Sequence, residues 1–365
     1  MASFTIDSSD LKKIISQIEP MLKGNINGIQ KVLFSISEGK ICVSATNGDA
    51  YIKVNFESET LSDGEFVISG EKLARIAKQN TSKNVKFELE NNTLIITAGS
   101  YSYGLALLDT RLDIFDAPEF DGGNTFTILA QDLKSAIVAV SCCIDSAKAH
   151  LNCVMVHTDS EKKNQLNIVA TDGMRLGVVE RKAIYDVEVP NLMIPKKAAD
   201  YILTIIGDMS GEITIKYTDN MIQLSTGSIL YTSKLLDTNF PKYQSVIPIS
   251  NNKILEAKVA DMREAIKQTS SMMEITFRIK MNIEADKVRI SCEDNGDTAK
   301  GEFAATYSQT EPMEIICNFK LLMDILEKIS STDVRIQIMD PTTPLLIRSV
   351  SDETIRYVFM PFVSQ

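Results

Sequence analysis

The chain has 365 residues, of which 44% are hydrophobic and 24% are charged. This length suggests two or three domains, and the composition is typical of soluble globular proteins. It excludes intrinsic disorder, which requires low hydrophobicity together with high net charge. The chain contains no run of about 18 apolar residues, the length needed to span a membrane. The N-terminal MASFTIDSSDLKK lacks the layout of a secretory signal. The net charge of −10 argues against a strongly basic surface for nucleic acid.

The first 110 residues alternate between helical and strand-like patterns. Apolar residues at helical spacing predict amphipathic helices over 8–19 and 70–80. Between them, KVLFSISEGKICVSATNGD predicts a strand–turn–strand that ends in the turn pair Asn47-Gly48, where glycine accepts a positive φ. After the second helix, VKFELENNTLIITAG predicts a hairpin with one buried face. We expect the LLDT segment at 107–110 to form a closing strand.

The same order of elements returns in the middle of the chain. A helix is predicted over 131–142, and a strand–turn–strand that begins at Val154 ends in Asp172-Gly173. A second helix over 195–206 precedes the hairpin ITIKYTDNMIQLSTG, and LLDT recurs at 235–238. The middle of the chain therefore repeats the first part.

A third copy follows. It has predicted helices over 259–270 and 319–330, a turn at Asn295-Gly296 and the hairpin VRIQIMDPTTPLLIRS. Four recurring signals in register predict three similar α+β domains, each with two amphipathic helices packed on antiparallel sheet. Boundaries in polar, turn-rich segments give domains at 1–122, 123–250 and 251–365.

Charge is distributed unevenly along this repeat. The six predicted helices contain twelve basic and nine acidic residues, a net charge of +3, so the remainder of the chain carries −13. One interpretation is that this distribution has no functional meaning, because Lys and Arg suit exposed helix faces in any soluble protein. Alternatively, the helices form a weakly basic face on an acidic body, which could contact phosphates without binding them tightly.

No pattern predicts catalysis, a metal site or a cofactor. The chain has no Gly-rich phosphate loop, HExxH or GxSxG motif. Its two histidines have no neighbours that would orient them for acid–base chemistry. The six cysteines show no metal-type spacing and are expected to be reduced thiols in a cytosolic protein. The run at 293–297 lacks the ligand spacing of a calcium loop, and a hairpin turn is expected there.

Three segments carry a resemblance to a known family: ATDGMRL at 170–176, SKLLDTNFPKYQSVIP at 233–248 and YVFMPF at 357–362. Together with the threefold repeat, they resemble the bacterial DNA polymerase III beta subunits, the β sliding clamps, over the whole chain. The resemblance implies a non-catalytic processivity factor, a head-to-tail ring homodimer whose helices line the hole around duplex DNA. Six helices packed about 8–10 Å apart would leave a hole of only about 7 Å, whereas twelve leave about 25 Å. A duplex about 20 Å across therefore needs two chains.

The resemblance also implies partners and site residues. The expected partners are double-stranded DNA without sequence preference, the replicative polymerase alpha subunit, the clamp loader, translesion polymerases, ligase and mismatch-repair proteins. The expected location is the bacterial cytoplasm, on the nucleoid, with no membrane partner. Proteins would dock through short apolar peptides in a pocket between the second and third domains. The residues implied for this pocket are Leu151, Cys153, Thr171, Gly173, Met174, Arg175, Leu176, Pro241, Ser245, Val246, Leu321, Thr342, Pro344, Val358, Phe359, Met360, Pro361 and Phe362.

Two further sets follow from the same resemblance. The DNA-facing set is Lys12, Lys13, Lys23, Asn25, Lys72, Arg75, Lys78, Lys134, Lys148, His150, Lys196, Lys197, Arg263 and Lys267. The dimer interface is expected at the edge strand Tyr101, Tyr103 and Leu105 and at Met272 and Met273. Family members usually have His at Met174, a basic residue at Ser245 and Arg-Leu in the tail where this chain has 363–365, so a shifted peptide preference is expected. Because tyrosines occupy usually basic positions at the joint, its affinity should depend weakly on salt.

Two alternatives remain open at this stage. One is a repeat scaffold that binds proteins without encircling DNA. The other is an enzyme with an unrecognised site, which would need a deep polar pocket with perturbed titrating groups. Ring closure around DNA discriminates between the clamp and the scaffold.

Overall fold

The computed structural model describes residues 3–22, 30–37, 39–58, 63–118, 120, 122–159 and 161–362. The chain divides into two compact units. The first consists of Met1–Ala130, Tyr185–Val187 and Lys197–Leu235, and the second of Gln131–Ile184, Glu188–Lys196 and Leu236–Gln365. The middle repeat therefore contributes to both units.

The first unit contains two antiparallel sheets. One has the order β1 (Ser3–Asp7), β6 (Asn84–Glu90), β7 (Thr93–Ala98), β8 (Tyr101–Ala106). The other begins with β5 (Gly64–Ser69), β2 (Lys31–Ser37), β3 (Lys40–Thr46), β4 (Ala50–Glu57). It continues through β16 (Ile229–Lys234), β15 (Met221–Ser225), β14 (Glu212–Tyr217), β9 (Asn124–Leu129).

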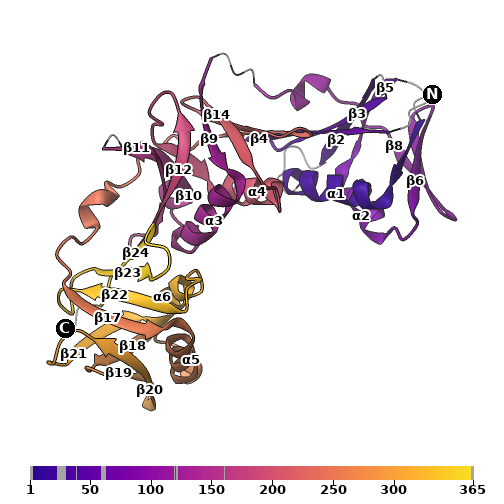
Figure 1. The fold of residues 1–365 in the computed structure, drawn as a ribbon. Helices are drawn as coiled ribbons and strands as arrows, with labels where there is room; N and C mark the ends of the chain where they lie inside the picture. Colours follow the sequence, from indigo (N-terminus) through magenta and orange to yellow (C-terminus); the bar gives the residue numbers. More distant parts are fainter. Residues whose placement is uncertain are drawn as a thin grey trace. The chain divides into compact units, whose positions relative to one another are not determined.

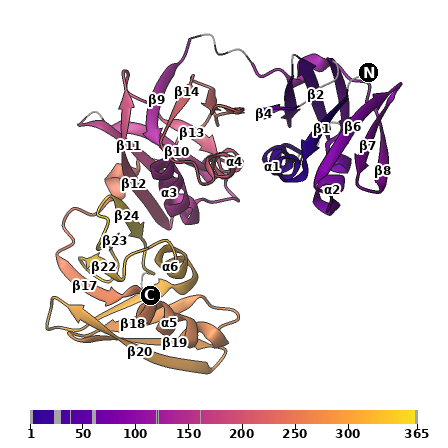
Figure 2. The same ribbon diagram turned by 45° about the vertical axis from the view of Figure 1, so that its right-hand side comes forward.

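Helices cover these sheets because each has one apolar face. The helical elements of this unit are α1 (Ser8–Ile18), η1 (Glu19–Leu22), α2 (Gly70–Gln79), η2 (Leu112–Phe115) and α4 (Lys196–Ile206). The two helices α1 and α2 lie side by side, and α1 contacts strands of both sheets (Figures 1 and 2). Side-chain oxygens of Asp7 and Ser69 accept the backbone N–H groups of Ser9 and Lys72, which caps both helices.

The second unit repeats this plan. Its larger sheet begins with β13 (Leu192–Pro195), β10 (Cys153–Asp159), β11 (Lys162–Thr171), β12 (Arg175–Tyr185). It continues through β24 (Ile355–Phe359), β23 (Leu345–Ser349), β22 (Asp333–Ile338), β17 (Lys253–Lys258). The other sheet has the order β21 (Met313–Asn318), β18 (Arg278–Ile283), β19 (Lys287–Asp294), β20 (Asp297–Tyr307). The helical elements are α3 (Ala130–Val140), η3 (Ser141–Cys143), η4 (Ala149–Leu151), η5 (Tyr243–Val246), α5 (Val259–Thr269), η6 (Ser270–Met272) and α6 (Phe319–Leu326).

The predicted threefold repeat is confirmed by the order of the elements. Each copy runs strand, helix, four strands, helix, three strands, starting at β1, β9 and β17. The six predicted helices are present, and their ends differ by at most a few residues. The largest difference is in α6, which ends at Leu326 because Lys328 donates to the Ile325 carbonyl and the chain turns. The predicted domain boundaries fall in the connections after β8 and β16, and they remain predictions.

One detail of the sequence-based prediction is wrong. The LLDT segments do not form strands: Leu108 and Leu236 each make one equivalent backbone bond, to Val67 and Met193, and no ladder follows. The predicted turn at Asn295-Gly296 is present, but its geometry differs from that of the first two. Asn295 and Gly296 both have positive φ and join β19 to β20 as a two-residue hairpin.

Other expectations can be compared with the part of the chain that the structure describes. All six cysteines are free thiols, and four of them are buried. The run at 293–297 forms the hairpin turn just described, and no group of three or more potential metal ligands occurs in the described ranges. No helix among these residues is long and apolar enough to cross a membrane.

Candidate functional site

The ATDGMRL motif forms a rigid turn between β11 and β12. The Thr171 hydroxyl donates to the Arg175 carbonyl at 2.8 Å and accepts the Gly173 N–H at 3.1 Å. One carboxylate oxygen of Asp172 accepts the N–H groups of Met174 and Arg175, both at 2.8 Å. Gly173 has a φ of 89°, which a side chain would strain. The turn therefore presents Met174, which is 41% exposed, from a fixed backbone.

Arg175 ties this turn to α6. Its guanidinium donates to the Asp172 carboxylate at 3.0 Å, to the Leu321 carbonyl at 3.0 Å and to the Asp324 carboxylate at 2.8 Å. The side chain is only 8% exposed, so these bonds form largely away from water. Arg175 thus joins a turn of the second repeat to a helix of the third.

The C-terminal segment closes the other side of the turn. Strand β24 pairs with β12, and Met360 then donates its N–H to the Met174 carbonyl at 2.9 Å. Phe362 continues along β21 through an N–H bond of 2.7 Å to Ile316, and the Arg278 guanidinium lies 4.8 Å from its ring centre. The YVFMPF motif is therefore both a strand of the core and an edge of the candidate site.

An apolar cluster lies between these elements. Cys153, Leu176 and Val358 belong to it, together with Tyr243 and Leu346, which the sequence did not assign to the site. Tyr243 begins η5, and Val246, at the end of η5, is 48% exposed. The cluster thus has a buried floor and an exposed apolar margin.

The predicted pocket residues divide by exposure. Leu151, Cys153, Thr171, Arg175, Leu176, Val358, Phe359 and Pro361 are buried; Leu321, Pro344, Met360 and Phe362 are half-buried; Pro241, Ser245, Thr342, Met174 and Val246 are exposed. Phe359 is 0% exposed and supports the site from within the core. The side chains that a ligand could contact are therefore those of the turn, η5 and the segment after β24.

Burial keeps the floor of the cluster neutral. It raises the pKa of the Cys153 thiol to about 12, so that thiol stays protonated at neutral pH. Burial also lowers the pKa of His157, which lies two residues beyond Met155 of the cluster on β10. The margin holds one buried cation, Arg175, whose charge is matched by two carboxylates.

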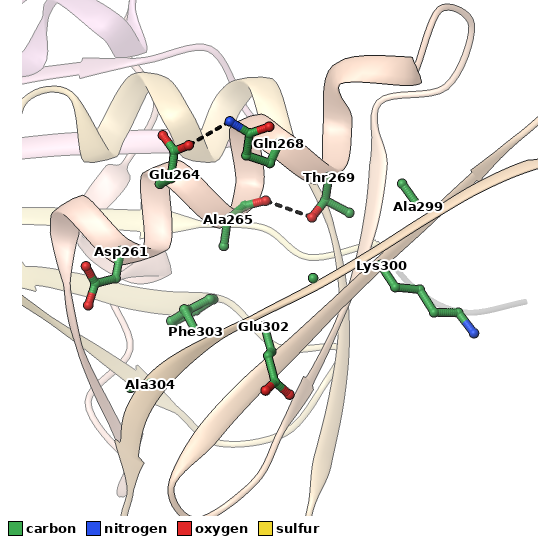
Figure 3. Close-up of a pocket in the computed structure, with 11 residues that line it drawn as sticks. Asp261, Glu264, Ala265, Gln268, Thr269, Ala299, Lys300, Glu302, Phe303 and Ala304 are labelled. Carbon is green, nitrogen blue, oxygen red and sulfur yellow. Dashed lines mark hydrogen bonds between the residues drawn. The ribbon is translucent and has the colours of Figure 1, made fainter.

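A hollow of about 480 Å³ lies between α5 and β20 of the same unit (Figure 3). It is lined by Asp261, Glu264 and Gln268 of the helix and by Lys300 and Glu302 of the strand. The strand passes close to the helix at Gly301, where a Cβ would lie 2.7 Å from the Thr269 hydroxyl. Met272, at the end of η6, is 55% exposed.

The outer edge of β8 and part of the outer edge of β20 have no partner strand among the described residues. In the first unit, β8 pairs only with β7, and Tyr101 on it is 66% exposed, whereas Leu105 is buried and Tyr103 half-buried. In the second unit, β20 pairs with β19 on one side up to Ala304 and with β17 only from Ala305 onward. Unpaired edges are sites where another strand can add.

The predicted DNA-facing residues lie on helices and on the η4 segment, with Lys23 and Asn25 outside the described residues. The residues Lys12, Lys13, Lys72, Arg75, Lys78, Lys148, His150, Lys197 and Lys267 are exposed, and Lys134, Lys196 and Arg263 are half-buried. Several are already paired: Arg75 with Glu71 at 3.0 Å, Lys78 with Glu19 at 2.5 Å and Arg263 with Glu327 at 3.5 Å.

Lys148 differs from the other cations. Its ammonium pairs with Asp145 at 3.2 Å and donates to the Asp172 carbonyl at 3.3 Å, so it lies against the turn that carries Met174. Sequence reasoning placed this residue with DNA alone and did not foresee that contact. It also missed Asp324 and Tyr243, although Tyr243 lies in the quoted FPKY motif.

Family profiles match the chain in three consecutive ranges. They are the N-terminal domain of the DNA polymerase III beta subunit over residues 2–114, the central domain over 127–242 and the C-terminal domain over 244–363. Together these ranges cover nearly the whole chain. The chain belongs to the DNA polymerase III beta subunit family.

Individual relatives agree with this membership over their full lengths. The beta sliding clamp of Vibrio cholerae is 22% identical over 369 residues, covering 98% of this chain and 99% of the relative. A sliding clamp of Bartonella birtlesii solved with griselimycin has a TM-score of 0.92 and 25% identity, with 100% of both chains covered. The beta subunit of Thermotoga maritima has a TM-score of 0.91 and 22% identity, again with full coverage.

Membership of this family establishes the general function. The beta subunits are the sliding clamps of DNA polymerase III, and the protein is a processivity factor for DNA replication. It is a non-catalytic polymerase subunit. The three-domain clamp fold implied by the resemblance is confirmed.

Proposed function

We propose that the protein works as a head-to-tail homodimeric ring that encircles duplex DNA and captures short apolar peptides beside the Met174 turn. The peptide site is supported chiefly by one arrangement: Arg175 and the bond from Met360 to Met174 hold the turn, α6 and the C-terminal segment together. Because these bonds are internal, a peptide meets a preformed surface and loses little affinity to ordering it.

The chemistry of the margin selects the ligand. Met174 and Val246 are exposed, Met360 and Phe362 are half-buried, and the floor beneath them is apolar. A peptide with aliphatic and aromatic anchors would bury them there, each contributing about 1.5–3 kcal/mol. Such peptides would bring the replicative polymerase alpha subunit, the clamp loader, translesion polymerases, ligase and mismatch-repair proteins to the ring in the bacterial cytoplasm.

Ring closure would use the two unpaired edges. The β8 edge of one copy would meet the α5–β20 region of another copy, with Tyr101 beside Met272 and Met273 at the joint. The β8 edge lies in the first unit and the β20 edge in the second, so each copy offers two different surfaces, which suits a closed head-to-tail pair. Closure would also remove both edges from solvent.

DNA would be held by linkage rather than by tight contacts. Arg75, Lys78 and Arg263 already have carboxylate partners, so these three helix cations are less available to neutralise phosphates. Weak, screened attraction allows a ring to slide, because each strong phosphate contact would have to break at every step.

Retention on circular DNA tests the ring. The protein is placed on nicked circular plasmid by a clamp loader, and the plasmid is then cut once. We expect retention on circles and loss from linear ends. Equal loss from both would refute topological linkage and favour a protein-binding scaffold that does not encircle DNA.

Griselimycin, which is bound in the Bartonella birtlesii structure, serves as a probe of the peptide site. Replacing Met360 and Phe362 by alanine should weaken its binding by at least tenfold in calorimetry, because two apolar anchoring surfaces are lost. Sedimentation should show an unchanged dimer. Unchanged griselimycin affinity in this double variant would contradict the assignment of the site.

A further inference from the structure

A buried histidine is bonded to the segment that forms one wall of the candidate peptide site. The Nε2 atom of His157 lies 2.9 Å from the Tyr243 hydroxyl, and its Nδ1 atom lies 2.7 Å from the Thr158 carbonyl oxygen. The two rings meet edge to face at 5.7 Å. His157 is 6% exposed and Tyr243 is 5% exposed, so water does not compete for this bond.

The acceptors around the ring determine its neutral form. A carbonyl oxygen can only accept, so Nδ1 must carry the proton and donate to Thr158. Nε2 is then a bare acceptor, and the Tyr243 hydroxyl donates to it. In this form both ring nitrogens and the hydroxyl are satisfied inside the protein.

Tyr243 connects His157 to the candidate peptide site. It is the first residue of η5, whose later residues Ser245 and Val246 are exposed members of the predicted pocket. Its ring packs in the apolar cluster with Leu176 and Val358 and against Phe240. The position of η5 against the cluster therefore depends on where the Tyr243 ring is held.

We propose that His157 is a positioning residue for peptide binding, which fixes η5 through the Tyr243 hydroxyl and does so only as the neutral imidazole. The inference rests on the proposed peptide site. It adds to that site a residue that contacts no ligand and that makes the affinity for apolar peptides depend on pH.

Protonation of His157 would break its hydrogen bond with the Tyr243 hydroxyl. A proton on Nε2 turns the acceptor into a donor, so the Tyr243 hydroxyl would have to point its own proton at another acceptor. In the described part of the chain, the Tyr243 hydroxyl has no hydrogen-bond partner other than His157. An unpaired buried hydroxyl is costly, and η5 would have to shift to relieve it.

Charged groups of both signs surround His157 and Tyr243. Asp159 on β10 faces His157 and favours the imidazolium, and Asp159 and Glu180 on β12 both face Tyr243. Arg356 on β24 faces the same hydroxyl and is held by Glu180. Burial outweighs the attraction of Asp159 and holds the pKa of His157 below its ordinary value of 6.5. The neutral form therefore predominates at pH 7.5, and the bond is lost as the pH falls through this lowered pKa.

The test measures griselimycin affinity by calorimetry for the full-length protein from pH 7.5 to pH 5. His157→Phe removes the acceptor, and His157→Gln restores an acceptor that does not titrate in this range. We expect the Phe variant to bind about fivefold more weakly at pH 7.5, the order of one buried hydrogen bond. The Gln variant should bind like the original protein at pH 7.5 and lose the weakening in acid.

Two further variants separate positioning from general destabilisation. Tyr243→Phe in the His157→Phe background should cause no additional loss, because the orphaned hydroxyl is removed as well. Tyr217→Phe is the matched control: Tyr217 is also buried and its hydroxyl has no partner within the described residues, but it lies in the first unit. It should leave griselimycin affinity unchanged at every pH.

The outcomes distinguish this proposal from the proposed function. If the unaltered protein does not bind griselimycin at any pH, the peptide site itself fails and the positioning role fails with it. If the unaltered protein binds, but its pH profile persists in His157→Gln or its affinity is unaffected by His157→Phe, only the positioning role is refuted. A lower melting temperature without a change in affinity would likewise show a purely structural role.

Discussion

Replacing Arg175 by methionine tests the link between the Met174 turn and α6. Methionine keeps most of the apolar length of the side chain but none of its donors. The change leaves the Asp172 and Asp324 carboxylates and the Leu321 carbonyl without the guanidinium. It therefore removes two of the polar contacts between the second and third repeats within the second unit, those to Leu321 and Asp324.

The expected loss follows from the exposure of each partner. The bond to Asp172, which is 14% exposed, should contribute roughly 1.5–3 kcal/mol as a buried charged pair. The bond to Asp324, which is 49% exposed, is screened by water and should contribute less than about 1 kcal/mol. With about 1 kcal/mol for the Leu321 carbonyl, the variant should lose about 2.5–5 kcal/mol.

Scanning calorimetry measures this loss as a lower melting temperature of the second unit. A loss of this size corresponds to a shift on the order of 10 °C for a unit of this length. Arg111→Met is the control, because Arg111 is 83% exposed and, among the described residues, pairs only with Asp113, so no measurable shift is expected. A shift below about 2 °C for Arg175→Met would refute the argument that this guanidinium joins the two repeats.

Three other outcomes are expected. Charge reversal of Lys12 and Lys72 should reduce loading onto DNA more than it reduces griselimycin binding, because both residues are exposed and have no ion pair among the described residues. Charge reversal of Lys163 and Lys182, which lie on strands, should not reduce loading onto DNA. The proposed dimer should dissociate little as salt rises, because we expect tyrosine and methionine to dominate its joint; sedimentation showing strong dissociation at high salt would contradict this. His157 should contribute stability above pH 6.5 and lose it as pH falls through its lowered pKa, and denaturation of His157→Gln should lack that loss.

The threefold repeat could be predicted from the sequence because its signals are local. Apolar spacing determines which face of a helix is buried, so Leu73 and Leu322 occupy equivalent buried positions in α2 and α6. Turn pairs such as Asn47-Gly48 fix where the chain reverses. The LLDT segments misled the prediction because Leu108 and Leu236 pack in apolar clusters and make a single backbone bond to the neighbouring strand, without continuing into a ladder.

The candidate site was only partly predictable, because its contacts join residues far apart in the chain. The resemblance identified Arg175 and Leu321, but the third contact of that guanidinium, with Asp324, depends on how α6 is oriented. The bond between His157 and Tyr243 spans 86 positions and has no local signal. A pattern of residue types therefore locates the surface, whereas packing decides which polar groups support it.

The repeat also explains why one junction, and not both, should bind apolar peptides. The bond from Met360 to the Met174 carbonyl has an equivalent in the first unit, where Lys234 donates its N–H to the Asp49 carbonyl, also at 2.9 Å. There the two side chains form an ion pair at 3.1 Å, with Asp49 83% exposed. The backbone bond is the same, but the solvated Lys234–Asp49 ion pair takes the place of the two methionines. An apolar side chain placed over this pair would remove water from both charges, which is unfavourable. We therefore expect the side chains at these two positions, which the repeated fold does not determine, to decide which junction binds peptides.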